Sequence, residues 1–302
     1  MKQMTIAIAL LTALFACNST TQTKEEKTNP LDSLNASIEQ ILQGKKADVG
    51  VAILGPDGQQ QISINGDKAY TIMSVVKFPQ ALYILHLVEK GTLKLDQPVN
   101  FTAAELNRDT HSPLRDGSNG KPVTVPLSKV IEYAVSVSDN IACDKLFDLG
   151  GGPAAMNKYF EEMKVKDFHT ASDYKHIKMD SLFVNNATPN AMLELLKRFN
   201  DGDFVNDSSH AFLWNIMINS PSGPNRLRGR LPETAVVAHK TGTFFSDSTN
   251  ILAINDAGIV QMPDKRKFII VVFVNNSKET PETNYRIIAD ISKACWDFYQ
   301  KN

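Results

Sequence analysis

The stretch MSVVKFPQALYILHLV, residues 73–88, places a serine and a lysine at the front edge of an apolar helical pattern. Ser74 and Lys77 are three residues apart, so their side chains share a face on a helix that begins near Ser74. The first turn of such a helix offers free N–H groups, and Pro79 is consistent with a start this close to the serine. The stretch therefore predicts a hydroxyl beside an amine at the mouth of a buried helix.

A serine hydroxyl becomes a useful nucleophile when a neighbouring base accepts its proton. An amine in a desolvated pocket is neutral for part of the time and can serve as that base during attack on a carbonyl. The same S-x-x-K spacing recurs at residues 118–121 and 172–175, where it does not head an apolar helix. By spacing alone, a helix cap beside an exposed cation explains Ser74 and Lys77 equally well, so other motifs must decide.

The composition limits the classes of function. The chain has 302 residues, 42% of them hydrophobic, which is enough for one large or two closely associated domains. Lys and Arg number 32 against 33 for Asp and Glu. The near-zero net charge therefore provides no positive potential that would attract a nucleic acid backbone. The histidines do not follow a metal-ligand spacing. We expect no metal, no cofactor and no nucleic acid partner, and nothing in the sequence demands more than a monomer.

The N-terminus has the pattern of an export signal. Residues 1–16 join a lysine to an apolar stretch too short to span a bilayer, which predicts a signal peptide of lipoprotein type. The sequence LFAC, residues 14–17, resembles a bacterial lipobox, in which Cys17 is lipidated; cleavage by an ordinary signal peptidase is the alternative. Polar residues 17–30 form a flexible tether. We expect an exported protein, periplasmic or membrane-anchored, that contacts the membrane only through this lipid.

The remaining residues, 31–302, predict one catalytic unit of α+β class. Strand patterns lie near both ends of this unit, as a hairpin around GPDG and as three runs at 234–244, 249–262 and 267–276. Helical periodicity fills the middle, over 75–90, 127–149, 153–163, 189–200 and 208–219. We expect an antiparallel sheet of about five strands built from both chain ends and flanked by helices. The sheet subdomain comprises residues 31–73 plus 231–302, and an inserted helical subdomain comprises residues 74–230.

Two cysteines follow the lipobox. Cys143 and Cys295 lie in helix-like apolar contexts, NIACDKLF and ISKACWDFY, and are far apart in the sequence. Such positions are typical of small buried thiols, because two distant cysteines form no metal-binding or redox spacing. A disulfide between them remains open at the level of sequence.

Two further motifs give Ser74 and Lys77 a context. S-D-N at residues 138–140 begins another apolar helical run, and K-T-G at residues 240–242 lies on a predicted strand. In this order, the three motifs resemble the signature of class A β-lactamases and related penicillin-binding proteins. The resemblance covers nearly the whole chain after the tether and is closest to the extended-spectrum and anaerobe-derived branch. It implies a β-lactamase/transpeptidase-like fold, a β-lactam substrate and a role in antibiotic resistance.

The resemblance also implies an acyl-enzyme route. Ser74 would attack the lactam carbonyl with the help of Lys77. The backbone N–H groups of Ser74 and Thr243 would stabilise the oxyanion, where one missing donor typically costs about 10²- to 10³-fold in rate. Ser138 would pass a proton to the leaving nitrogen.

Substrate-binding roles follow by the same residue-by-residue match. Asn140 would hydrogen-bond the substrate amide, and Lys240 and Thr241 would bind the substrate carboxylate. Gly242 would let the substrate approach the strand closely. Arg226 matches a position at which some family members keep a carboxylate-binding arginine; a surface arginine in the basic stretch RLRGR is the alternative.

One family feature is missing. Class A β-lactamases carry a glutamate about 34 residues after the S-D-N asparagine, and it activates the water that hydrolyses the acyl-enzyme. The corresponding stretch here is HTASDYKHIKMD, residues 169–180, and an ungapped count reaches Tyr174. Asp173 could take the role only through a one-residue shift, with Asp180 or a route driven by Lys77 as alternatives. A shorter, displaced base predicts slow deacylation.

Three functions are therefore compatible with the sequence. The first is a serine β-lactam hydrolase with weak deacylation. The second is a penicillin-binding peptidase acting on D-Ala-D-Ala, because such enzymes share Ser-Lys and K-T-G and need no loop glutamate. The third is a domain that β-lactams acylate and that stays acylated, as a trap or sensor.

Overall fold

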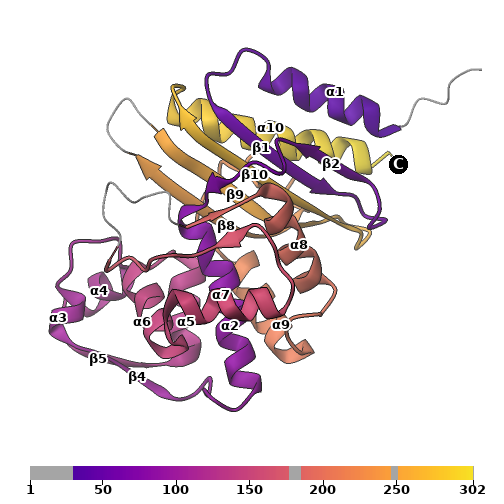
Figure 1. Cartoon of the computed structure of the whole chain (residues 1–302). Helices are drawn as coiled ribbons and strands as arrows, with labels where there is room; N and C mark the ends of the chain where they lie inside the picture. Colours follow the sequence, from indigo (N-terminus) through magenta and orange to yellow (C-terminus); the bar gives the residue numbers. More distant parts are fainter. Residues whose placement is uncertain (1–29, 177–184, 246–250, 302) are drawn as a thin grey trace, which may run out of the picture.

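A computed structural model describes residues 30–176, 185–245 and 251–301. Its centre is a five-stranded antiparallel sheet in which strands from both ends of the chain lie side by side (Figure 1). The strand order is β2-β1-β10-β9-β8. The bounds are β1 Asp48–Leu54, β2 Gln61–Ile64, β8 Val236–Phe245, β9 Ile251–Gln261 and β10 Lys267–Ser277. The predicted α+β class and the sheet built from both chain ends are confirmed.

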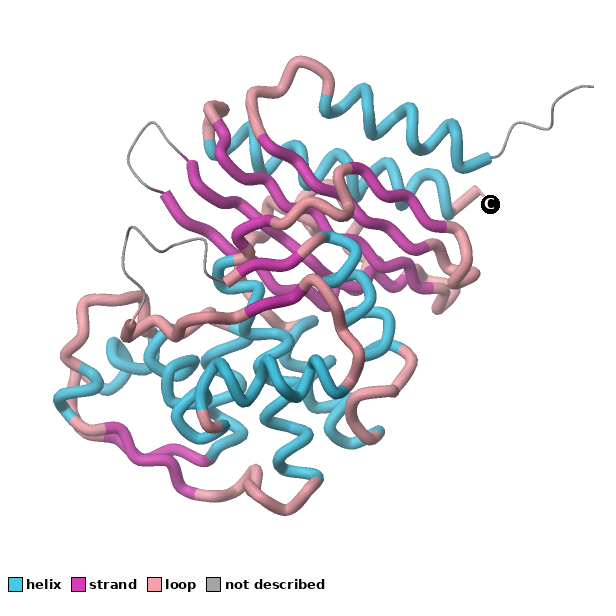
Figure 2. The backbone as a smooth tube through the Cα atoms, viewed as in Figure 1, coloured by secondary structure: helices cyan, strands magenta, loops and turns pink. Residues whose placement is uncertain are grey.

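Both faces of the sheet are covered. Helices α1 (Pro30–Leu42) and α10 (Pro281–Tyr299) pack on one face, and the helical half of the molecule covers the other (Figure 2). Strand β10 is a nearly continuous apolar run because it is buried on both sides. Its alternate side chains enter two separate cores: Ile270 and Val272 pack toward α1 and α10, whereas Val271 and Phe273 pack toward the helical half.

The helical half is arranged around α2 (Lys77–Glu89), whose residues from Lys77 to Leu85 are all buried. A 3₁₀ turn, η1 (Met73–Val76), leads into it and contacts β8 and β9. The other helices of the described residues are α3 Ala103–Leu106, α4 Pro113–Ser118, α5 Leu127–Ser136, α6 Asn140–Gly150, α7 Gly152–Glu162, α8 Pro189–Asn200 and α9 Asp207–Ile218. Short strands complete this half: β3 Tyr70–Thr71, β4 Pro98–Phe101, β5 Val123–Pro126, β6 Phe168–His169 and β7 Asn186–Ala187.

The helical periodicity predicted over residues 127–149 comprises two helices, α5 and α6, and the second begins at the S-D-N motif, as the apolar run after this motif indicated. The chain breaks between α5 and α6 because Ser138 adopts a left-handed backbone conformation with φ of 59°. The Asp139 carboxylate then caps α6 by accepting a hydrogen bond from the backbone of Ala142, and it also accepts one from the Ser112 hydroxyl. This break brings Ser138 to the mouth of the pocket described below.

Cys143 and Cys295 are both free and buried, and they belong to the two different cores. The prediction of buried thiols is confirmed, and the open alternative of a disulfide between them is excluded. The predicted signal peptide and Cys17 lie outside the described residues, as does Asp180. Within the described ranges, no helix is both long and apolar enough to cross a membrane.

Candidate active site

Ser74 lies in η1, where the first helical turn meets the sheet. Met73 just before it has φ of 50°, an unusual conformation for a residue with a side chain. Strand β8 approaches this turn closely: a Cβ atom at Gly242 would lie 2.4 Å from the Ile72 carbonyl oxygen and 3.2 Å from the Ser74 nitrogen. Glycine is therefore required at position 242 by the packing of the strand on the turn.

Lys77 is fully buried and hydrogen-bonded on several sides. Its Nζ donates to Ser74 Oγ at 3.1 Å, to the Ser138 carbonyl at 2.7 Å and to Asn140 Oδ1 at 2.6 Å. Burial lowers the pKa of Lys77 to about 8, because desolvation disfavours the ammonium form. The alternative of an exposed cation beside a helix cap is excluded by these contacts.

Two lysines share the Ser138 hydroxyl. Lys77 Nζ lies 3.3 Å from Ser138 Oγ, and Lys240 Nζ donates to the same oxygen at 3.1 Å. Burial and then the neighbouring charge of Lys77 lower the pKa of Lys240 well below its usual value. An anion bound beside Lys240 would relieve the repulsion between the two lysines. A proton can pass between Lys77 and Lys240 through the Ser138 hydroxyl that they share.

Arg226 is buried rather than on the surface, with 6% of its area exposed. Its guanidinium donates to Thr243 Oγ1 at 2.6 Å and to the Gly242 carbonyl at 3.1 Å. Among the described residues, a cavity of about 600 Å³ joins these groups to the nucleophile. Its lining includes Ser74, Ser138, Asn140, Tyr174, Arg226, Thr241 and Thr243. The three sequence motifs therefore converge on one space, with a cationic side suited to a carboxylate.

Asp173 is not placed at the nucleophile. Its Oδ1 accepts hydrogen bonds from the backbone nitrogen and from the ring Nδ1 of His176, at 2.9 and 2.7 Å. The Tyr174 hydroxyl instead lies 2.9 Å from Ser74 Oγ, and Lys77 Nζ lies 4.5 Å from the centre of the Tyr174 ring. Burial raises the pKa of Tyr174, so the phenol is neutral at ordinary pH.

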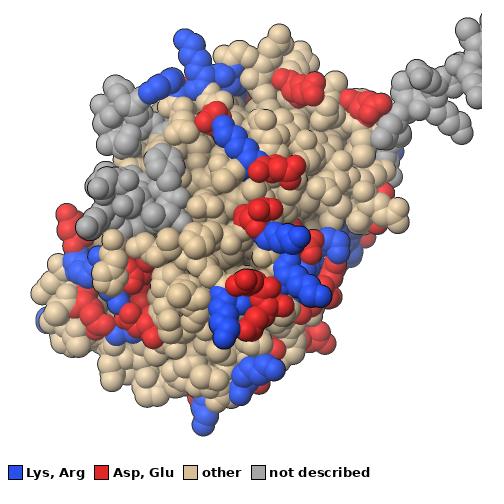
Figure 3. All heavy atoms as spheres, viewed as in Figure 1, with Lys and Arg blue, Asp and Glu red and all other residues tan. Residues whose placement is uncertain are grey.

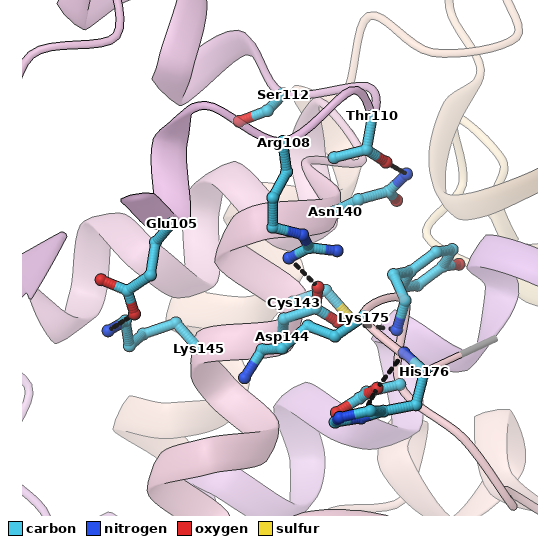
Figure 4. A network of polar contacts seen from close by, with 12 residues as sticks. Glu105, Arg108, Thr110, Ser112, Asn140, Cys143, Asp144, Lys145, Lys175 and His176 are labelled. Carbon is cyan, nitrogen blue, oxygen red and sulfur yellow. Dashed lines mark hydrogen bonds and ion pairs between the residues drawn. The ribbon is translucent and has the colours of Figure 1, made fainter. Parts of the chain in front are cut away.

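The backbone of Tyr174 is held by Asp144, a residue that the sequence reasoning missed. Asp144 Oδ1 accepts from the Tyr174 nitrogen at 2.7 Å, and Oδ2 pairs with Arg108 at 2.5 Å (Figure 4). Burial raises the pKa of Asp144 to about 6, although Arg108 opposes this shift. The next turn of α6 adds a second contact, in which Lys175 pairs with Asp148 at 2.6 Å.

A second wall of the pocket was also missed. Asn140 Nδ2 donates to Thr110 Oγ1 at 2.8 Å, and His111 lines the cavity beside Thr110. Figure 4 shows Thr110 beside Asn140, with a dashed line between the two side chains. Asn140, Asp144 and Asp148 follow each other at intervals of four residues, so this polar face of α6 was a signal that the sequence did contain.

No group of three or more His, Cys, Asp or Glu side chains could hold a metal ion within the described ranges. The cavity lining instead supplies several hydroxyls and a guanidinium, and two buried amines bond the hydroxyls of Ser74 and Ser138 from behind the lining. These groups can deprotonate a nucleophile, move a proton and bind an anion.

Comparisons with known proteins agree with this site. A model of the β-lactamase enzyme family matches residues 33–299. The extended-spectrum β-lactamase PER-1 of Pseudomonas aeruginosa is 37% identical over 270 residues, which cover 89% of this chain and 88% of that protein. A β-lactamase of Bacteroides uniformis is 36% identical over 294 residues, covering 96% and 97% of the two chains.

Solved structures give the same result. A representative class A β-lactamase from Bacteroides cellulosilyticus superposes with a TM-score of 0.86 at 32% identity, covering 91% of this chain and 99% of that one. The chain therefore belongs to the β-lactamase enzyme family. It is a serine hydrolase of the class A type, as the sequence motifs indicated.

Proposed function

We propose that the chain hydrolyses β-lactams through an acyl-enzyme on Ser74 and that its deacylation is slow. Ser74 Oγ attacks the lactam carbonyl carbon, and the ring C–N bond breaks. The serine proton passes through neutral Lys77 and the Ser138 hydroxyl to the leaving nitrogen. Lys240, Thr241 and Arg226 bind the substrate carboxylate. The names of the related proteins support the substrate class.

The convergence of the three motifs carries this proposal. Lys77 contacts both Ser74 and Ser138, and Lys240 contacts the same Ser138 oxygen. A proton removed from the nucleophile therefore has a continuous path of hydrogen-bonding groups to the far side of the cavity. Proton transfer by positioned groups of this kind typically contributes about 10²- to 10⁴-fold to the rate.

We infer slow deacylation from the identity of the side chain beside Ser74, which is Tyr174. Ester hydrolysis needs a base for the attacking water, but a neutral phenol with a raised pKa is a poor base. Among the described residues, no carboxylate oxygen forms a hydrogen bond with Ser74, and Asp173 is engaged by His176. Asp180, outside the described residues, and Lys77 remain alternative bases in this proposal.

Stopped-flow measurement with a chromogenic cephalosporin tests both parts. We expect a burst of about one product equivalent per enzyme, followed by slow turnover. Tyr174→Glu restores a carboxylate and should raise the slow phase by at least ~10-fold, whereas the matched control Tyr174→Phe should not. Absence of any product from wild type and from Tyr174→Glu contradicts acylation of Ser74. Fast turnover by wild type without a burst contradicts slow deacylation.

A peptidase is the second candidate, because no described carboxylate contacts Ser74 and penicillin-binding peptidases need no loop glutamate. Release of D-alanine from a peptide ending in D-Ala-D-Ala would favour it. Inertness toward that peptide, together with a cephalosporin burst, would remove it. A burst with no later turnover of either substrate would favour the trap or sensor.

We also propose export and anchoring through a lipid on Cys17. The apolar segment and the lipobox-like LFAC support this location. Expression of the full chain in a bacterium, with labelled palmitate, should give a labelled membrane fraction, whereas Cys17→Ser should not. Equal release of both forms in soluble, unlabelled form would contradict the anchor.

A further inference from the structure

Asn255 is fully buried in the middle of β9, and no step of the acyl transfer proposed above uses it. Its Nδ2 donates to the Thr71 carbonyl at 2.8 Å. Its Oδ1 accepts from the Val274 nitrogen and from Asn275 Nδ2, both at 3.1 Å. The carboxamide of Asn255 therefore links Thr71, which lies just before the nucleophile, to the central strands of the sheet.

Asn275 completes the same contact from β10. It is 3% exposed, and its Oδ1 accepts from the Thr71 nitrogen at 2.9 Å. Both main-chain groups of Thr71 are thus bound by buried carboxamides, three residues before Ser74. Buried networks in which each member is bonded are stiff, because an unpaired polar group in a dry interior is costly.

Asn255 is also adjacent to strand β8, which forms the other side of the reaction centre. Asn255 lies directly opposite Gly242 in the β8–β9 register, and the next pair along is Ile254 with Thr243. The Asn255 carbonyl accepts from Arg226 Nη1 at 2.8 Å. One residue thus contacts, through its side chain, the segment that leads to Ser74 and, through its backbone, the strand that carries Thr243.

We infer that Asn255, assisted by Asn275, is a positioning residue that sets the separation of the two oxyanion donors, the backbone N–H groups of Ser74 and Thr243. The inference rests on the proposed acyl transfer. The two donors come from segments far apart in the sequence, so a rigid connection between η1 and β8 must fix their distance. A displacement of about 1 Å in such a site can cost ~10²-fold in rate.

The experiment compares Asn255→Ala with Asn284→Ala. Asn284 is an equally buried asparagine whose side chain bonds Ser277 and Thr280 at the start of α10 and does not line the cavity. Both variants should lose stability, so melting temperatures show that each remains folded at the assay temperature. The milder Asn275→Ser removes one contact of Thr71 and serves if Asn255→Ala does not fold.

We expect the acylation rate constant to fall by roughly 10- to 100-fold in Asn255→Ala and by a smaller factor in Asn275→Ser. The affinity for a boronic acid that mimics the tetrahedral oxyanion should fall in parallel. The dissociation constant of the complex before acylation should stay within about 2-fold, and Asn284→Ala should match wild type in all three quantities. A role in folding alone would not move the boronic acid affinity.

Two outcomes overturn the inference in distinguishable ways. If wild type is acylated and the folded Asn255 and Asn275 variants are acylated at the same rate, the positioning role is wrong while the proposed function stands. If wild type forms no acyl-enzyme, the proposed function fails and the inference falls with it.

Discussion

At the scale of single residues, the charge of Lys77 decides whether Ser74 can react. The buried amine donates to three oxygen atoms in its protonated form, which holds the site together. Only the neutral amine can accept the Ser74 proton. The pKa of about 8 places the change between these forms near the working range of a typical enzyme.

This gives a pH dependence for acylation. The neutral fraction of Lys77 is about one tenth at pH 7 and about nine tenths at pH 9, from a pKa of about 8. The acylation rate constant should therefore rise by roughly 10-fold between pH 7 and 9 and then level off. Single-turnover burst rates over this range check it, with Tyr174→Phe as the control that leaves Lys77 in place. A flat profile would show that neutral Lys77 is not the base.

The residue scale also shows where sequence reasoning stops. The motifs identified the nucleophile and the lysines and hydroxyls bonded around it, because each motif requires a specific chemical type at a specific spacing. They could not decide between Asp173 and Tyr174, since a shift of one residue in an irregular loop exchanges the two side chains. That choice depends on the contact between Asp144 and the Tyr174 backbone, which joins residues 30 positions apart.

At the scale of elements, the site depends on how closely β8 packs on η1. The Gly242 position faces the Ile72 carbonyl, which belongs to the backbone and cannot move aside as a flexible side chain could. On the other side of the cavity, the residues between α5 and α6 place Ser138 at the site. There Asp139 caps α6, a signal present in the sequence as an N-cap residue before an apolar run. The two-residue strands β3, β6 and β7 were not predictable, because they are too short for any periodicity.

Gly242→Ala should therefore impair both stability and acylation. The new methyl group would lie 2.4 Å from the Ile72 carbonyl oxygen, and overpacking of this kind costs about 1–3 kcal/mol. Because the turn must move away from the strand, the acylation rate should fall by ~10-fold or more. Thermal melting and burst kinetics measure the two effects. Gly117→Ala, where a Cβ meets no atom within 4 Å in helix α4, should lower neither. A Gly242→Ala variant with the wild-type melting temperature and burst rate would contradict this packing argument.

At the scale of the whole molecule, two cores lie on opposite faces of one sheet, and the reaction centre lies where the helical half meets β8. Acidic and basic side chains are interspersed on the face shown in Figure 3, in keeping with the near-zero net charge. The sequence predicted this arrangement because strand patterns occur near both ends of the chain. It could not predict how the segment before Ser74 is joined to the sheet, since the contacts of Asn255 and Asn275 with Thr71 depend on strand register.

The two cores each contain one cysteine, which allows global unfolding to be measured. Burial raises the pKa of both Cys143 and Cys295, so neither thiol should react with a disulfide reagent in the native protein. With Cys17→Ser to remove the remaining thiol, labelling should stay near zero in buffer and reach two equivalents in denaturant. If the two thiols become reactive at different denaturant concentrations, the cores unfold separately. Rapid labelling of either thiol in buffer would contradict its burial.

The most direct measurement of the central claim is a time course of intact protein mass after mixing with a β-lactam. We predict an adduct of one β-lactam molecule per chain that maps to the peptide containing Ser74. It should persist in wild type, disappear faster in Tyr174→Glu and never form in Ser74→Ala. An adduct on another residue, or an unmodified wild-type chain while the antibiotic is not consumed, would contradict the account.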